Sequence, residues 1–274
     1  MIRHFRSAIT QLMSIAVGLV LVFPIVYAVA GAFKTPAEFA VWPPTLFAES
    51  YLNFDNFRYV FGHSPMWRYM LNSLITASLT TIVRLTLASL AAYAFAFFDF
   101  RGKRTLFLLI LITMMLPGET LTITNYRTVS RMSLTDTYLG ICIVSFVGAS
   151  QMFVLTGQFR QIPVELRDAA LLDGCGDMRY LARVVLPMSR GILLTLGLQC
   201  FITQWNSYLW PLLVTGRDSM RTVQVGITML TNTEATNYEV VLAGACIAMV
   251  PSLLMFFLSR RMMTGTQTGG AVVE

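Results

Sequence analysis

The chain has 274 residues, of which 55% are hydrophobic and only 12% are charged. Soluble domains carry about 25% charged residues, so this composition excludes an ordinary soluble protein and indicates one that crosses a membrane several times. The net charge of +6 does not indicate nucleic-acid binding, because the basic residues adjoin apolar segments and form no basic face interleaved with aromatic residues.

Apolar segments long enough to cross a bilayer, which takes about 20 helical residues, recur along the chain. The first follows Arg3 and Arg6 and is too long for the apolar core of a signal peptide, so we expect an uncleaved helix. The expected fold is an all-α membrane protein in which residues 1–274 form a single transmembrane domain. We predict six spans, at about residues 8–33, 70–98, 105–126, 137–159, 188–214 and 240–259.

The segments between the spans differ in character. Residues 34–67 contain prolines and many aromatic residues, which favours an external loop with short helices lying flat on the membrane. The third span is interrupted at Met115–Glu119, where Pro117 removes a backbone hydrogen bond and Gly118 adds freedom, so we expect a kink there. Residues 216–239 form a polar outer loop.

Positive charge predicts the orientation, because basic residues gather on the cytoplasmic side. With both termini cytoplasmic, twelve basic residues lie inside: Arg3, Arg6, Arg101, Lys103, Arg104, Arg160, Arg167, Arg179, Arg183, Arg190, Arg260 and Arg261. Seven lie outside: Lys34, Arg58, Arg68, Arg127, Arg131, Arg217 and Arg221. This orientation places residues 160–187, the longest polar loop between two spans on that side, in the cytoplasm.

Residues 160–187 are dense in both signs of charge. Pro163 suits the first turn of a helix, where Glu165 and Asp168 would face the positive end of the helix dipole. Gly174 supplies a C-terminal stop in a conformation with positive φ. The helix would carry a short apolar stripe of Leu166, Ala169 and Ala170, widened by Leu171 and Leu172. A second helical run over residues 178–186 should end at Pro187.

The order of residues in this loop resembles the EAA loop of permease subunits of binding-protein-dependent ABC importers. The matching residues are Asp168-Ala169-Ala170, Gly174, Val184, Leu186 and Pro187, with Asp168 in place of the usual glutamate. The alternative is a cytoplasmic surface helix in which the alanines occur by chance. In that family the loop forms a coupling helix that fits a groove on the cytoplasmic ATPase. The resemblance therefore assigns ATPase coupling to Glu165, Asp168, Ala169, Ala170, Leu171, Leu172, Asp173, Gly174 and Pro187.

Further stretches resemble the second permease of carbohydrate importers of the maltose and glycerol-phosphate type: Asn72-Ser73-Leu74, residues 91–95, residues 204–211 and the tail, residues 269–274. This resemblance implies a type I ABC importer permease fold in the inner membrane of a prokaryote. The implied partners are a homologous second permease, two ABC ATPase subunits and an extracytoplasmic solute-binding protein. It also implies that this chain binds no cofactor and that the ATPases use ATP and Mg.

Several polar residues in or near the spans are candidates for the solute pathway. Arg84 lies near the middle of the second span, where a cation is costly unless it faces protein or water. It either lines the pathway or pairs with a partner subunit, or else it snorkels or makes a structural ion pair. Sugars need amide and hydroxyl hydrogen bonds together with aromatic stacking. The other candidates are Glu119, Asn125, Gln204, Trp205, Asn206 and Tyr208.

Catalysis finds no support in the sequence. Gly102-Lys103 lacks the upstream glycine and the following Ser or Thr of a phosphate-binding loop, and the four cysteines form no CxxC pair. We therefore expect a translocation subunit that is not an enzyme and that holds no metal. Two other classes are the alternatives: an ion-coupled secondary transporter, which should show paired broken helices in repeated halves, and a membrane-embedded enzyme, which would need a cluster of polar catalytic residues.

Reporter fusions test the predicted topology. A fusion after Arg101 should report the cytoplasm and a fusion after Tyr51 the outside, because the six spans and the charge bias put these loops on opposite faces. Reports from the same side would contradict the topology.

Overall fold

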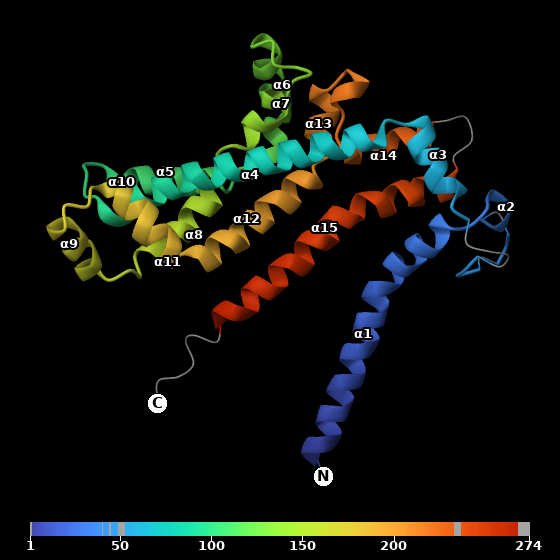
Figure 1. Ribbon diagram of the computed structural model, residues 1–274, viewed down its shortest axis with the longest axis horizontal. Helices are drawn as coiled ribbons and strands as arrows, with labels where there is room; N and C mark the ends of the chain where they lie inside the picture. The colour runs from blue at the N-terminus through green and yellow to red at the C-terminus, as the bar shows by residue number, and fades with distance from the viewer. Residues whose placement is uncertain (1, 40, 44, 49–52, 233–236, 268–274) are drawn as a thin grey trace. The chain divides into compact units, whose positions relative to one another are not determined.

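The computed structural model describes residues 2–39, 41–43, 45–48, 53–232 and 237–267 (Figure 1). All regular elements within these ranges are helical, which confirms the all-α prediction. Tyr51 and the tail, residues 269–274, lie outside the described residues.

The helices are listed here in chain order. The α-helices are α1 (Ile2–Ala32), α2 (Pro36–Phe39), α3 (Asp55–His63), α4 (Met66–Phe97), α5 (Lys103–Thr113), α6 (Thr122–Arg131), α7 (Tyr138–Cys142), α8 (Ala149–Phe159), α9 (Val164–Leu172), α10 (Asp177–Tyr180), α11 (Leu186–Met188), α12 (Arg190–Trp205), α13 (Leu209–Val214), α14 (Val223–Met229) and α15 (Tyr238–Gln267). Short 3-10 helices are η1 (Gly118–Leu121), η2 (Ile143–Ser145), η4 (Asp218–Met220) and η5 (Leu230–Asn232), and η3 (Leu181–Val185) is a π-helix.

Three helical stretches are long and apolar enough to cross a membrane: Thr10–Ala32, Met66–Phe97 and Tyr238–Phe257. Three further stretches pass the same test only as bent pairs, so the described chain has up to six candidate spans. The pairs are Lys103–Thr113 with Gly118–Arg131, bent by 89°, Tyr138–Ser145 with Ala149–Phe159, bent by 53°, and Asp177–Met188 with Arg190–Trp205, bent by 83°.

The bent pairs show where the sequence-based boundaries differ from the structure. The expected interruption of the third span is present, because α5 ends at Thr113 and η1 begins after Pro117. The fourth segment, expected to be continuous, breaks between Ser145 and Ala149. The helical run expected to stop at Pro187 continues through the π-helical turn η3 and past this proline to Met188. Residues 216–239, expected to form a polar loop, include the apolar helix α14.

The chain divides into two compact units, whose boundaries fall within α4, just before α14 and within α15. Unit 1 comprises Met1–Arg68 and Val223–Val250. Here Asn56 caps the end of α1: its amide nitrogen donates to the carbonyl oxygens of Ala32, at 2.9 Å, and Lys34, at 2.8 Å. The buried Lys34 ammonium donates to the carbonyl and hydroxyl oxygens of Thr45. Polar side chains therefore satisfy the backbone where α1 ends.

Unit 2 comprises Tyr69–Thr222 and Pro251–Glu274 and contains the long loop, residues 160–187. Its main core joins α4, α8, α12 and the second half of that loop, as the ribbon shows (Figure 1). Side chains that are almost fully buried in this core are Ala92, Tyr93, Leu155, Phe159, Tyr180 and Val185. The second half of the loop is thus packed against the helices by apolar contacts.

A polar network stands at the other end of α4 in unit 2. The Asn72 side chain is fully buried; its amide nitrogen donates to the carbonyl oxygens of Ser219, at 2.9 Å, and Arg221, at 2.8 Å. Its amide oxygen accepts from the Tyr138 hydroxyl at 2.8 Å. Asn72 therefore ties α4 to two segments that are distant in the sequence.

Replacing Asn72 by leucine tests this network. The substitution keeps the volume but leaves two carbonyl groups and one hydroxyl without their partner, and each buried polar group so orphaned costs about 1–3 kcal/mol. Thermal unfolding in detergent should show a clear drop in midpoint for Asn72→Leu and a smaller one for Tyr138→Phe, which removes a single bond. Equal midpoints for Asn72→Leu and the wild type would contradict the structural role of Asn72.

Candidate functional site

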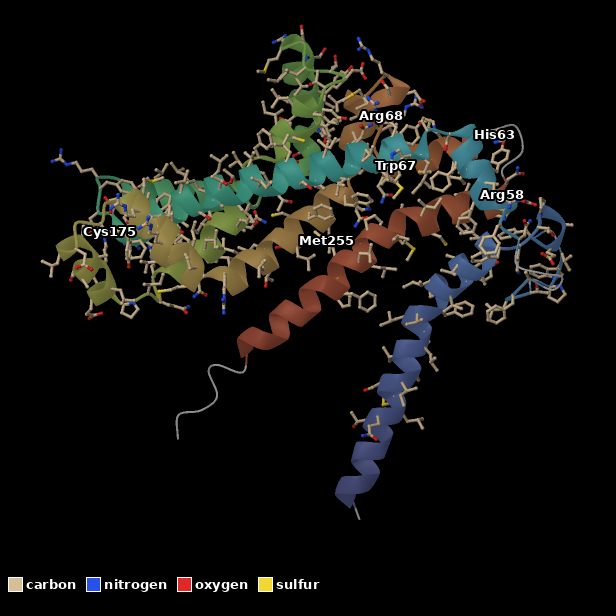
Figure 2. The ribbon with its side chains drawn as sticks, in the orientation of Figure 1. Arg58, His63, Trp67, Arg68, Cys175 and Met255 are labelled. Carbon is tan, nitrogen blue, oxygen red and sulfur yellow. The ribbon has the colours of Figure 1, made fainter. Side chains whose placement is uncertain are left out.

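The candidate coupling site is the loop of residues 160–187, which comprises α9, α10 and η3 at one end of unit 2 (Figure 1). Cys175, labelled in Figure 2, lies in the short connection between α9 and α10. The helix expected from the sequence is present as Val164–Leu172, with Pro163 as its N-terminal cap residue and Glu165 in its first turn.

The end of α9 has the backbone geometry that the sequence predicts. Gly174 has φ +70°, which confirms the expected left-handed conformation. The Cys175 amide donates to the Ala170 carbonyl at 2.8 Å, and the Gly174 amide donates to the Leu171 carbonyl at 3.0 Å. This pair of bonds is a Schellman motif, which satisfies carbonyl groups that the end of a helix would otherwise leave open. The helix therefore ends at a defined point.

The surface of α9 is open to its surroundings. Leu172 is 89% exposed and Leu171 is 51% exposed at the C-terminal tip. Glu165, Asp168 and Ala169 are exposed as well, whereas Ala170 is half-buried. Val164 and Leu166 are exposed nearer the N-terminus, so the helix presents four large apolar side chains among its carboxylates, two of them at the C-terminal tip.

One side chain of α9 reaches back to the body of unit 2. The Arg167 guanidinium donates to the carbonyl oxygen of Phe97, the last residue of α4, at 2.7 Å, and approaches Asp177 Oδ1 at 3.4 Å. The Tyr93 hydroxyl donates to that same Asp177 oxygen at 2.9 Å. The guanidinium also lies over the rings of Phe97 and Phe98, 5.7 and 5.4 Å from their centroids. We refer to Arg167, Asp177 and Tyr93 as the α9 clamp.

The second half of the loop is part of the core. Tyr180, Leu181 and Val185 are buried against α4 and α8. The π-helical turn η3 over Leu181–Val185 was not anticipated from the sequence. Pro187 is exposed just beyond it, one residue inside α11.

The pathway candidates lie mainly at helix breaks. Glu119 is exposed in η1, and Asn125 is half-buried in α6. Trp205 is 1% exposed and stacks on Phe201 with ring centroids 6.0 Å apart, so its ring faces are covered by protein. The remaining candidates surround the break between α12 and α13: Gln204 is buried, and Asn206 and Tyr208 are exposed.

Arg84 has a partner within this chain. Its Nε donates to the carbonyl oxygen of Ser145, the last residue of η2, at 2.5 Å. A Cβ at Gly148 would stand 3.1 Å from Arg84 Cδ and 2.1 Å from Gln151 Oε1, so the break before α8 packs closely against this arginine. The contact fits a structural role for Arg84, and a role in the pathway stays a prediction.

Sequence reasoning missed the α9 clamp. Arg167 and Asp177 are two of many charges in the loop, and nothing in their spacing of ten residues indicates contact. Tyr93 belongs to residues 91–95, which the resemblance singled out without giving them a role. The sequence feature that could have indicated the clamp is therefore Tyr93, a hydroxyl-bearing residue near the cytoplasmic end of a predicted span, on the same side of the membrane as the charged loop.

Comparison with known proteins gives the family. The sequence profile of the binding-protein-dependent transport system inner membrane component matches residues 84–264. The chain belongs to this family. It is therefore a multi-pass permease subunit of the inner membrane and not an enzyme.

Relatives match the permease over most of its length. It is 30% identical over 257 residues to the arabinooligosaccharides transport system permease protein AraQ of Halalkalibacterium halodurans, covering 93% of this chain and 92% of that protein. It is 32% identical over 251 residues to the sn-glycerol-3-phosphate transport system permease protein UgpE of Pectobacterium atrosepticum, covering 89% of each.

Solved structures share the fold. A chain of a bacterial ABC transporter involved in the import of the acidic polysaccharide alginate matches with TM-score 0.83 and 21% identity, covering 94% of this permease and 96% of that chain. A chain of a bacterial alginate ABC transporter in complex with an alginate pentasaccharide-bound periplasmic protein matches with TM-score 0.70 and 14% identity, covering 96% of each. These matches confirm the type I importer permease fold, and neither the family nor the relatives support the ion-coupled secondary transporter.

Two glycines in the loop allow a matched test of the α9 terminus. A Cβ would meet nothing within 4 Å at Gly174 or at Gly176, but only Gly174 has a positive φ. Gly174→Val should therefore strain the turn by about 1–3 kcal/mol, whereas Gly176→Val should not, because φ is −68° there.

Hydrogen exchange measures the difference. The amides of residues 174 and 175 should exchange faster in Gly174→Val than in Gly176→Val, with the spans unaffected in both. Equal protection in the two variants would show that the Schellman motif does not hold the end of α9.

Proposed function

We propose that this permease is one of two homologous permeases in an ATP-driven importer of a sugar or a sugar-like solute. The relatives support this proposal: one is named for arabinooligosaccharides and another for sn-glycerol-3-phosphate, and both match most of the chain. The solute would pass from an external solute-binding protein through the two permeases into the cytoplasm. Both termini of this chain would be cytoplasmic, as the charge bias predicts.

Coupling to ATP hydrolysis is assigned to α9, and the observation that carries the assignment is its exposed apolar tip. Leu172 is 89% exposed on a helix that Arg167 ties to its own unit and that a Schellman motif caps. A side chain of this size in open water, at the end of an ordered helix, fits a surface that a partner covers. The coupling set remains Glu165, Asp168, Ala169, Ala170, Leu171, Leu172, Asp173, Gly174 and Pro187.

The partner at α9 would be one of two cytoplasmic ABC ATPases. ATP and Mg would be bound there, since this chain carries no phosphate-binding loop. The carboxylates of Glu165 and Asp168 would form the polar rim of the contact, and the two leucines its apolar centre. This arrangement follows the usual composition of protein interfaces.

The solute pathway is assigned to polar groups near the helix breaks. Asn206 and Tyr208 lie exposed beside the break between α12 and α13. Glu119, Asn125 and Gln204 supply further hydrogen-bonding groups, and Arg84 a positive charge. Trp205 would meet a solute only if its contact with Phe201 opened, which makes it the weakest of the aromatic candidates.

Inverting the charge of Asp168 tests the coupling assignment. A cation in the first turns of α9 opposes the helix dipole by only about 0.3–1 kcal/mol, so the helix should persist. Asp168→Lys should nevertheless lose the ATPase subunit in pull-downs from detergent, because the charge offered to the partner is reversed. Insertion into the membrane should match that of the wild type.

Asp99 provides the control, because its carboxylate is fully exposed and makes an i,i+4 pair with Lys103 outside the loop. Asp99→Lys should retain the ATPase. Wild-type retention of the ATPase by Asp168→Lys would rule out α9 as the docking element.

A further inference from the structure

The α9 clamp joins three segments of unit 2 through one carboxylate oxygen and one backbone carbonyl. Asp177 Oδ1 accepts from Tyr93 on α4 at 2.9 Å and faces Arg167 on α9 at 3.4 Å. Arg167 donates in turn to the carbonyl oxygen of Phe97 at 2.7 Å. The Arg167 side chain is 22% exposed and that of Asp177 44%, so water has limited access to the arginine.

The chemistry of arginine suits this position. The end of α4 carries open carbonyl groups and the negative end of the helix dipole, both of which favour a cation. A planar guanidinium can donate to a carbonyl and a carboxylate at once while stacking on the Phe97 and Phe98 rings. Arg167 Nε is buried without a hydrogen-bond partner among the described residues, so the two terminal nitrogens and the two rings hold the group in place.

Apolar contacts also hold α9 to the core: Ile162 is buried just before the helix, and Ala170 and Cys175 are half-buried at its C-terminal end. After Leu172 the chain reaches α10 through four residues that include Gly174 and Gly176, and neither glycine has a neighbour within 4 Å of a Cβ position. The apolar contacts lie at the two ends of the helix, and between them Arg167 supplies a directional contact with α4 that resists rotation of α9 when a force is applied to its exposed tip.

We propose that Arg167, held by Asp177 and Tyr93, is the positioning residue that makes α9 and the Phe97 end of α4 move as one body. Displacement of α9 by the ATPase would then pass directly into α4, which continues from Phe97 back past Arg84 to Asn72. The proposal rests on the proposed function, because it takes α9 to be the helix on which the ATPase acts.

Spin-label distances in the assembled importer test this link. The four native cysteines, Cys142, Cys175, Cys200 and Cys246, would be replaced by alanine, and labels attached at Val164→Cys on α9 and Leu90→Cys on α4, both exposed positions. Distances would be measured without nucleotide and with ATP and orthovanadate. In the wild-type background the label distance should be the same in both states.

Arg167→Gln should separate the two helices. With ATP and orthovanadate, the distance distribution should broaden or shift by roughly 5 Å, about one turn of helix. The ATPase should be retained as in the wild type, because Arg167 points away from the docking surface. Arg104→Gln, which removes an exposed arginine from the start of α5, should leave both distributions unchanged. Tyr93→Phe keeps the ring but loses the hydrogen bond to Asp177. It should broaden the same distance distribution, and it replaces Arg167→Gln as the test if that variant does not assemble.

Two results would overturn the proposal: a narrow, state-independent distance in Arg167→Gln and Tyr93→Phe, or a distance that already changes with nucleotide in the wild type. Failure of the proposed function looks different. In that case Asp168→Lys would keep the ATPase in pull-downs, and the proposed link would fall with the docking assignment.

Discussion

The last carbonyl groups of a helix have no partner within that helix, and inside a bilayer no water is available to satisfy them. In this chain, side chains from elsewhere in the fold donate to such carbonyls. Arg84 donates to Ser145 at the end of η2, and Arg167 donates to Phe97 at the end of α4. Trp210 Nε1 donates to the carbonyl oxygens of Gly140 and Ile141 near the end of α7, at 3.3 and 3.1 Å. Each donor satisfies a carbonyl group at or near the end of a helix and also holds its own segment against that helix end.

This constraint explains why α4 is central to unit 2. Its buried Asn72 holds segments at one end, and Tyr93 together with the Phe97 carbonyl holds the loop of residues 160–187 at the other. Arg84 holds the broken fourth segment in between. A single continuous helix thus bears the contacts that shape both the candidate docking helix and the broken helices near the pathway candidates. Polar contacts, as well as the apolar core, therefore hold together segments of unit 2 that are distant in the sequence.

The sequence predicted what depends on local chemistry. Apolar length indicated the three long helices. Pro117 and Gly118 indicated the break in the third span, and Gly174 indicated the end of α9 with the correct sign of φ. It did not indicate the break before Gly148, where the Ser145 carbonyl accepts a hydrogen bond from Arg84, more than sixty residues away in the chain. The Arg167–Asp177 contact was missed for the same reason: a long side chain can reach many partners, and the fold selects one.

The Schellman motif and Arg167 have a consequence for the thermodynamics of assembly. Ordering a flexible segment during association costs free energy for every backbone residue and long side chain that is immobilised. Helix α9 is already folded, capped and oriented within this chain, so a partner that takes up Leu171 and Leu172 incurs little of that entropic cost. Most of the free energy from burying the two leucines would then remain as affinity.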